Sequence, residues 1–205
     1  MDISPANPVN HHADHPGFAG PMGLFAALTM LVAGGARARF VADLAALSSS
    51  DQVVDIGCGP GNSVRAGARR GACVIGVDPA MVMLGVARLV TRDRPSITWL
   101  QGSAENLPLP EHSATVVWSV ATVHHWADVA AGLVEVRRVL SPGGRFFAIE
   151  RRVRPGATGL ASHGWTDQQA ASFAACCRTA GLDDVQIETL KRGRRAVQVV
   201  KAIRR

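Results

Sequence analysis

The sequence predicts an α/β fold with a doubly wound, mostly parallel sheet and helices on both of its faces. From residue 51 onward, short runs of β-branched and apolar residues alternate with helical patterns. A glycine-rich turn, from Gly57 to Gly61, directly follows the first of these runs. The last two runs flank Gly193 with no helix between them, which predicts a terminal hairpin and an antiparallel edge to the sheet.

The first 35 residues form a segment of their own before this pattern begins. Residues 1–15 are polar and hold His11, His12 and His15. Because no carboxylate or cysteine completes a recognisable metal-ligand spacing, we expect a mobile terminus and no metal site. Residues 17–35 carry no charge. Their dense apolar part, 22–33, spans about 18 Å as a helix, which is too short for the ~30 Å core of a bilayer.

We therefore predict a short helix that ends at Gly34-Gly35 and a second helix over 36–47. Residues 1–35 are interpreted as a lid over the ligand site, and residues 17–35 as a stretch able to contact lipid peripherally. Residues 36–205 form the main domain. With 47% hydrophobic residues, the chain suits one domain with a sizeable core.

The remaining elements follow from periodicity and from residues that start or stop helices. Asp128 is placed to cap a helix with a single apolar stripe, and Pro142 follows where that helix must end. Thr166 and Gln169 predict a capping box for the last helix, which ends at Gly181. The predicted strands cover 53–56, Cys73–Asp78, Ile97–Gln101, 115–120, 145–150, 185–190 and 196–202.

The turn after the first strand lets a nucleotide-like ligand approach the backbone. Gly57, Gly59 and Gly61 have no Cβ, and Asn62 is placed to cap the helix that follows. The spacing is G-x-G-x-G, because Asn62 stands where the third glycine of the dinucleotide pattern G-x-G-x-x-G would be. Asp78 ends the second strand, where it can hold ribose hydroxyls, cap a helix, or do both.

Four stretches together resemble the class I S-adenosylmethionine (SAM)-dependent methyltransferases. Residues 55–61, Asp-Ile-Gly-Cys-Gly-Pro-Gly, are similar to the SAM signature, and residues 76–78 to the second motif of that family. Residues 102–108 resemble its adenine-contacting segment, and residues 139–144 the segment before its fifth strand. The agreement is closest with the small, ubiquinone-biosynthesis-like (type 11) group. This resemblance implies a Rossmann-like, seven-stranded sheet with one antiparallel strand, and SAM across the carboxyl ends of the first two strands.

The resemblance also implies roles for matching residues. Asp55 would orient the turn or the amino group of SAM, and Asp78 would hold both ribose hydroxyls. Ser103 stands where the family usually has aspartate, so this neutral partner would accept more weakly from the adenine amino group, and Glu105 would compensate. The implied cofactor-binding residues are Asp55, Gly57, Cys58, Gly59, Gly61, Asp78, Pro79, Met81, Ser103, Ala104, Glu105 and Ser119.

Methyl transfer from a sulfonium depends on alignment and on excluding water, and it needs a base only where the acceptor loses a proton. His124 and His125 follow the fourth strand at the ligand edge, and either could be that base, with His125 slightly ahead. The alternative is that neither takes part. Trp126 either walls the pocket or belongs to the core. Glu150 either faces the acceptor or pairs with a neighbouring arginine.

These observations predict a SAM-dependent methyltransferase that modifies a small acceptor, and the uncharged 17–35 stretch favours a hydrophobic one. Two alternatives stay open: a non-catalytic SAM-binding regulator or partner subunit, and an RNA methyltransferase, since the net charge is +6. Aromatic residues do not alternate with the basic ones, so nucleic-acid binding is not favoured. An NAD-dependent oxidoreductase is disfavoured by Asn62 and by the lack of any tyrosine for a Tyr-x-x-x-Lys pair. Four cysteines without a C-x-x-C pair fit a reduced, cytoplasmic protein.

Overall fold

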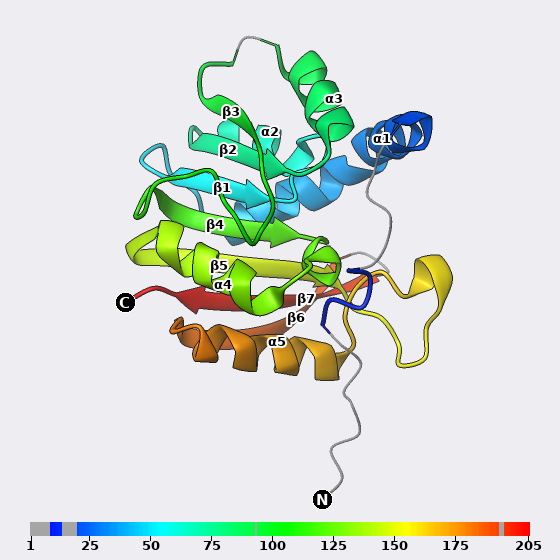
Figure 1. Cartoon of the computed structure of the whole chain (residues 1–205), viewed down its shortest axis with the longest axis vertical. Coiled ribbons are helices and arrows are strands. Elements are labelled where there is room, and N and C mark those ends of the chain that lie inside the picture. Colours follow the sequence, from blue (N-terminus) through cyan, green and yellow to red (C-terminus); the bar gives the residue numbers. More distant parts are fainter. Residues whose placement is uncertain (1–8, 14–19, 93, 193–194) are drawn as a thin grey trace, which may run out of the picture.

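The computed structural model describes residues 9–13, 20–92, 94–192 and 195–205, and it confirms the predicted α/β class. Its seven strands form one sheet in the order β3-β2-β1-β4-β5-β7-β6 (Figure 1). The first five strands pair in parallel, while β7 is antiparallel to both of its neighbours, as predicted. The strands are β1 (Gln52–Ile56), β2 (Cys73–Asp78), β3 (Ile97–Gln101), β4 (Ala114–Val120), β5 (Leu140–Arg151), β6 (Asp183–Arg192) and β7 (Arg195–Ile203).

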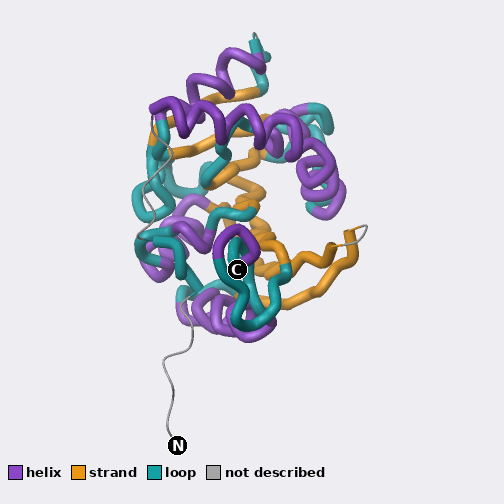
Figure 2. Tube along the Cα trace, turned by 90° about the vertical axis from the view of Figure 1, so that its right-hand side faces the viewer, coloured by secondary structure: helices purple, strands orange, loops and turns teal. Residues whose placement is uncertain are grey.

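Helices cover both faces of this sheet, so that the strands lie between helical layers (Figures 1 and 2). Two short 3₁₀ turns, η1 (Val123–His125) and η2 (Gly159–Ala161), lie in the loops that follow β4 and β5. One layer holds α4 (Val129–Val139) and α5 (Asp167–Thr179), and the other holds α1 (Gly20–Leu44), α2 (Asn62–Ala68) and α3 (Met81–Thr91).

Alternating side chains along each strand divide the core between these two layers. In β1, Val53 packs with the α1–α3 layer and Val54 with the α4–α5 layer. In β4, Trp118 packs with the α1–α3 layer and Val117 with the α4–α5 layer. Strands buried on both faces explain why the β-branched runs in the sequence are nearly continuous.

The amino-terminal helix differs from the prediction, because α1 runs unbroken through Gly34-Gly35 for 25 residues. A Cβ on Gly34 would lie 2.2 Å from Asn62 Nδ2, so glycine here lets α1 approach α2 and does not end a helix. Asn62 Nδ2 donates to the Met30 carbonyl at 2.7 Å. The predicted cap was also wrong: Gly61 occupies the cap position of α2 without a side-chain capping bond.

Among the described residues, α1 is the one helix long and apolar enough to cross a membrane, by length and composition alone. Only 17% of its most apolar 18-residue window is buried, and Met22, Phe25 and Val32 are exposed. Further along the helix, Val41 and Ala42 are buried in the domain. The helix therefore lies against the domain on one side and presents apolar side chains on another.

Residues 9–13 are packed, contrary to the mobile terminus predicted for 1–15. Val9 is buried, and its carbonyl accepts from Trp165 Nε1 at 3.1 Å. Asn10 Nδ2 donates to the Trp126 carbonyl at 2.9 Å, and the His12 N–H donates to the His124 carbonyl at 2.9 Å. This segment is thus held against the loops that follow β4 and β5. His15 lies outside the described residues.

Candidate functional site

The glycine turn joins β1 to α2 at the carboxyl edge of the sheet. Gly57, Gly59 and Gly61 have φ angles of 71°, 52° and 80°, a region that favours glycine. A Cβ on Gly57 would lie 2.7 Å from the Thr122 side chain, and one on Gly61 would lie 2.1 Å from the Trp99 ring. A Cβ on Gly59 would meet nothing nearer than Met30 Sδ at 3.9 Å. Two of the glycines thus allow close packing, whereas a Cβ on Gly59 would be in ordinary van der Waals contact with Met30.

Asp78 lies beside this turn, at the end of β2. Its Oδ2 accepts from the Gly59 N–H at 2.8 Å, and its Oδ1 accepts from the Ala80 N–H at 2.9 Å. Burial raises the pKa of this carboxyl above its usual range, and the two backbone bonds act against that rise. Each carboxylate oxygen keeps a second lone pair, so Asp78 can accept two further hydrogen bonds from a ligand.

Asp55 lies in β1, immediately before the turn, and is 1% exposed. Its Oδ2 has no hydrogen-bond partner among the residues that the structure describes. Burial raises the pKa of Asp55 to about 8; the neighbouring Trp118 indole acts against this rise and the charge of Asp78 adds to it. A buried carboxylate oxygen without a partner is costly, so the site favours a ligand with a donor or a cation at this point.

The remaining residues of the predicted cofactor set divide between exposed and buried positions. Pro79 and Met81 are exposed beyond β2, while Cys58, Ala104 and Ser119 are buried and Ser103 is half-buried. Burial also raises the pKa of the Cys58 thiol well above its usual range. Ser119 Oγ lies 2.5 Å from Thr122 Oγ1, which in turn donates to the Ile56 carbonyl at 3.0 Å. These bonds hold Thr122 against the glycine turn.

Glu105, which was expected to support Ser103 as an acceptor for the adenine amino group, is already engaged by the backbone. Its Oε1 accepts from the backbone N–H groups of Ala127 and Asp128 at 2.8 and 3.2 Å. The carboxylate therefore braces the loop that leads into α4. Trp126, in the same loop, is 5% exposed and belongs to the hydrophobic core, which decides between its two predicted roles.

His124 and Glu150 form a buried pair on the other side of Thr122. His124 is 2% exposed and Glu150 is 1% exposed, and Nδ1 of the histidine lies 3.0 Å from both carboxylate oxygens. An Nδ1–H that donates to the carboxylate leaves Nε2 with the lone pair. Sequence reasoning placed Glu150 beside the acceptor or an arginine and missed this pair.

His125 is half-buried next to His124, with ring centroids 4.2 Å apart. Burial, together with the neighbouring His124, lowers the pKa of His125 to about 4. The side chain is therefore neutral at pH 7 and is a weak base. Of the two histidines, it is His124 that has a carboxylate partner, Glu150.

His163 joins these two histidines from the loop between β5 and α5. Its ring centroid lies 5.4 Å from that of His124 and 5.6 Å from that of His125. Sequence reasoning missed His163, which lies 38 residues beyond His125 and in no recognisable motif. The one available signal was its position after β5, at the same sheet edge where β4 ends.

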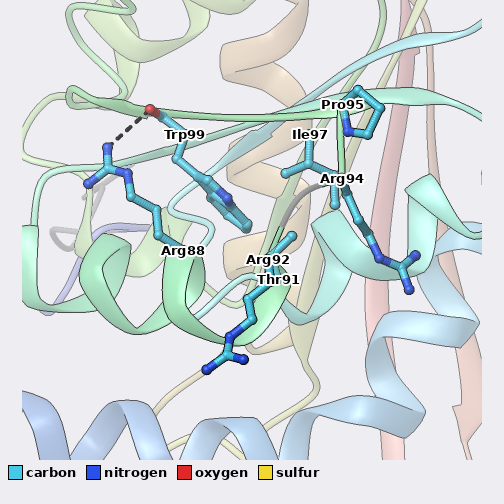
Figure 3. A pocket seen from close by; sticks show the side chains of 7 residues that line it. All are labelled: Arg88, Thr91, Arg92, Arg94, Pro95, Ile97 and Trp99. Carbon is cyan, nitrogen blue, oxygen red and sulfur yellow. Dashed lines mark hydrogen bonds between the residues drawn. The ribbon is translucent and has the colours of Figure 1, made fainter.

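A separate hollow of about 500 Å³ lies between α3 and β3 (Figure 3). It is lined by Arg88, Thr91, Arg92, Arg94, Pro95, Ile97 and Trp99. Ile97 begins β3, whereas the glycine turn and Asp78 lie at the carboxyl ends of their strands. The Trp99 side chain links this hollow to the turn, through its approach to Gly61.

The order and direction of the strands are those of the Rossmann-like fold that class I methyltransferases of solved structure share. Residues 54–148, somewhat less than half of the chain, match the family described as the methyltransferase domain. The unpartnered Asp55 oxygen and the Asp78 carboxylate beside the glycine turn can accept hydrogen bonds from the amino group and the ribose hydroxyls of S-adenosylmethionine.

Two relatives illustrate how far the sequence match extends. An uncharacterized methyltransferase of Mycobacterium tuberculosis (strain ATCC 25618 / H37Rv) is 40% identical over 98 residues, which are 48% of this chain and 39% of that protein. The demethylmenaquinone methyltransferase of Tropheryma whipplei (strain Twist) is 32% identical over 112 residues, which are 55% of this chain and 46% of that protein. The chain therefore matches less than half the length of these relatives.

Solved structures share the fold over most of the chain. A chain from the complex between the Haloferax volcanii Trm112 methyltransferase activator and a methyltransferase has a TM-score of 0.76 at 20% identity, covering 88% of this chain and 93% of that one. The Haemonchus contortus phosphoethanolamine N-methyltransferase 2, solved with S-adenosyl-L-methionine, has a TM-score of 0.72 at 17% identity, covering 96% and 60%. At these identities the likeness concerns the fold alone.

Proposed function

We propose that the chain is a SAM-dependent methyltransferase that acts on a small acceptor whose nucleophile must lose a proton. The observation that carries this proposal is the pair of buried carboxylates at the glycine turn, Asp55 immediately before it and Asp78 bonded to its Gly59 N–H. Asp55 has an oxygen without a partner among the described residues, which suits a cationic amino group. Asp78 has lone pairs to spare for the ribose hydroxyls.

Bound SAM supplies an activated methyl group, and the chain has to hold it, orient the acceptor and exclude water. Asp55 and Asp78 would fix the two ends of the methionine–ribose unit, and Ala104 would border the adenine. Thr122 reaches from the loop after β4 to the turn, so the residues that follow it lie on the acceptor side. The loop that follows Thr122 also carries His124, so this residue would lie on the acceptor side.

His124 is the base that the geometry favours. Glu150 holds its Nδ1–H, which fixes the ring and aims the Nε2 lone pair away from the carboxylate. A proton removed from an acceptor hydroxyl or phenol would go to Nε2. The resulting imidazolium would be stabilised by the adjacent buried carboxylate.

We further propose that residues 9–13, which contact the loops after β4 and β5, form the lid together with α1, and that the acceptor is hydrophobic. Met30, in α1, lies nearest to the Cβ position of Gly59, and the outer side of the helix is apolar. The Tropheryma whipplei relative is a demethylmenaquinone methyltransferase by name, which supports a hydrophobic acceptor for this chain. Peripheral lipid contact through 17–35 belongs to the same proposal, as does a cytoplasmic location.

The lid can be tested apart from SAM binding. Deleting residues 1–19 removes His11 and His12 and leaves α1 in place. Acceptor turnover should fall at least tenfold, while the affinity for S-adenosylhomocysteine (SAH), the demethylated product, should stay within about twofold. If turnover were unchanged in the shortened protein, residues 1–19 would have no role at the acceptor site.

A second candidate is a methyltransferase subunit that is silent until a partner binds. The Haloferax volcanii structure, in which an activator is named, is the observation that favours it. An RNA methyltransferase is the third, and it rests on the net charge of +6.

Transfer of labelled methyl groups from SAM separates these candidates. Purified protein is incubated with labelled SAM and with total lipid, small-metabolite, protein and RNA fractions, and Asp78→Ala serves as the inactive control. Label in the lipid or small-metabolite fraction supports the proposal. Label confined to RNA or protein overturns the acceptor class, and SAM binding without transfer to any fraction supports the partner-dependent subunit.

A further inference from the structure

Five histidines converge at the acceptor edge from three distant segments of the chain. His11 and His12 come from residues 9–13, His124 and His125 from η1, and His163 from the loop before α5. One ring nitrogen each from His124, His125 and His163 lies within 4.8 Å of the others. Such a gathering of imidazoles is unusual in a site that needs a single base.

The inner member of this cluster is oriented as metal-binding histidines are. Its Nδ1 faces both oxygens of the buried Glu150 at 3.0 Å, so Nε2 of His124 points to the opposite side. A carboxylate that accepts from the far nitrogen fixes the tautomer and raises the basicity of a ligating imidazole. His125 Nδ1 lies 3.4 Å from the His12 carbonyl, so its Nε2 is the nitrogen turned away from that backbone contact.

The third histidine is held by the backbone around it. Arg151 Nε donates to the His163 carbonyl at 3.0 Å, and Arg151 Nη2 donates to the carbonyls of Leu160 and Ala161 at 2.7 and 2.6 Å. Gly164 follows with a φ of 141°, and a Cβ there would lie 2.1 Å from the Arg151 carbonyl oxygen. The loop is therefore fixed to the end of β5 at the point where His163 faces η1.

The geometry points to a divalent transition-metal site of the zinc class, with His124, His125 and His163 as its three protein ligands. Imidazole ligands suit zinc and its transition-metal neighbours, whereas magnesium and calcium prefer oxygen. Three protein ligands with a fourth, exchangeable position are typical of catalytic zinc sites. Nitrogens at ~2.0–2.1 Å from a tetrahedral ion lie roughly 3.3 Å apart, so the three rings need only close inward from their present separation.

His12 is left outside the ligand set for a structural reason. Its Nε2 lies 3.1 Å from Ser162 Oγ, and its ring stacks on that of His163 with a centroid distance of 4.3 Å. This stacking supports the third ligand from its outer side. The fourth position would then be filled by water or by an oxygen of the acceptor, whose pKa a bound metal lowers.

The metal site can exist whether or not SAM binds, so its test is independent of the proposed methyltransferase activity. In the metal-bound form His124 acts as a ligand and not as a base, and the metal takes over activation of the acceptor. Direct metal binding to the protein without SAM therefore decides this inference without any turnover measurement.

The test uses the full chain without a histidine tag, stripped with a chelator and titrated with Co²⁺. The expected result is one ion per chain with the intense visible bands of four-coordinate cobalt, which Zn²⁺ then displaces. His163→Ala should weaken binding at least tenfold, and Glu150→Gln should weaken it by about 10–100-fold. Thermal unfolding of each variant checks that the fold is retained.

Two controls decide where a bound ion lies. His112→Asn changes an exposed histidine outside the cluster, and its φ of 56° suits asparagine, so binding should not change. The double variant His11→Ala/His12→Ala should bind within about threefold of the native chain. Absence of the cobalt bands would overturn the inference. So would equal losses in His112→Asn and His163→Ala, or a loss confined to the double variant.

Discussion

The two halves of the site are assembled in different ways. The glycine-turn half, residues 55–61 and 78–80, comes from two adjacent strands and their turns, and backbone bonds join its parts directly. The histidine half, residues 9–13, 122–126 and 150–165, comes from three segments that meet only in the folded chain (Figure 1). The two halves touch at Thr122, which is bonded to the Ile56 carbonyl, while His124 pairs with Glu150.

Asp78→Ala should have the largest effect, and only on the glycine-turn half. The variant loses two charge-assisted hydrogen bonds to the ribose, each worth roughly 1.5 kcal/mol, so SAH should bind about 100-fold more weakly. Isothermal titration calorimetry measures this change. The matched control is Asp184→Asn, an exposed aspartate with a φ of 48° that asparagine tolerates, and it should bind SAH normally. If Asp78→Ala bound SAH as tightly as the native chain does, Asp78 would not be part of the ligand site.

Glu150→Gln is the corresponding change in the histidine half. The amide keeps the shape of the side chain but not the charge that orients and supports His124, so kcat should fall by roughly 100-fold. The dissociation constant for SAH should stay within about twofold, because no bond links Glu150 to the glycine turn among the described residues. A matching loss of SAH binding would mean that the two halves are not separable.

The pH dependence of cofactor binding should follow Asp55. Its pKa is raised from 3.8 to about 8, so the free protein holds a proton there at pH 6.5 and must release it to pair with a cationic amino group. Affinity for SAH should therefore rise about tenfold from pH 6.5 to pH 8, with release of about one proton. The release is measured by calorimetry in buffers of different ionisation enthalpy.

The same raised pKa also has a stability consequence. Because the folded chain binds the proton more tightly than the unfolded chain does, this contribution is complete below pH 3.8 and is lost as pH rises towards about 8. Asp55→Asn should abolish both the proton release and this pH dependence. A native chain that binds SAH with no proton release at pH 6.5 would contradict the role given to Asp55.

The smallest effect is expected for the loss of the capping box at the start of α5. Thr166 and Gln169 close the start of α5 with a capping box, while Gly61 starts α2 without a side-chain cap. Thr166→Ala should lower the free energy of unfolding by about 1 kcal/mol, measured with urea. Thr179→Ala, an exposed change near the end of the same helix, should stay within about 0.5 kcal/mol of the native value. A smaller loss at Thr166 than at Thr179 would show that the box adds no stability.

The difference between the halves also explains what the sequence could predict. The strand–turn–helix around Gly59 and the place of Asp78 are local, so spacing and periodicity were enough to predict them. The unbroken α1 could not be predicted. Gly34 lacks a side chain because Asn62 of α2 packs against it, and a contact between two helices leaves no mark in the local sequence pattern. The pairing of His124 with Glu150 and the approach of His163 depend on β4 and β5 being neighbours and on the path of the loop after β5.

The most direct test of the account is a calorimetric titration of the untagged chain with SAH and, separately, with NAD. Asp55 and Asp78 flanking the glycine turn predict one SAH per chain, abolished or strongly weakened by Asp78→Ala, and no measurable binding of NAD. A chain that takes up no SAH at saturating concentration, or that binds NAD in preference, would contradict the assignment of this turn.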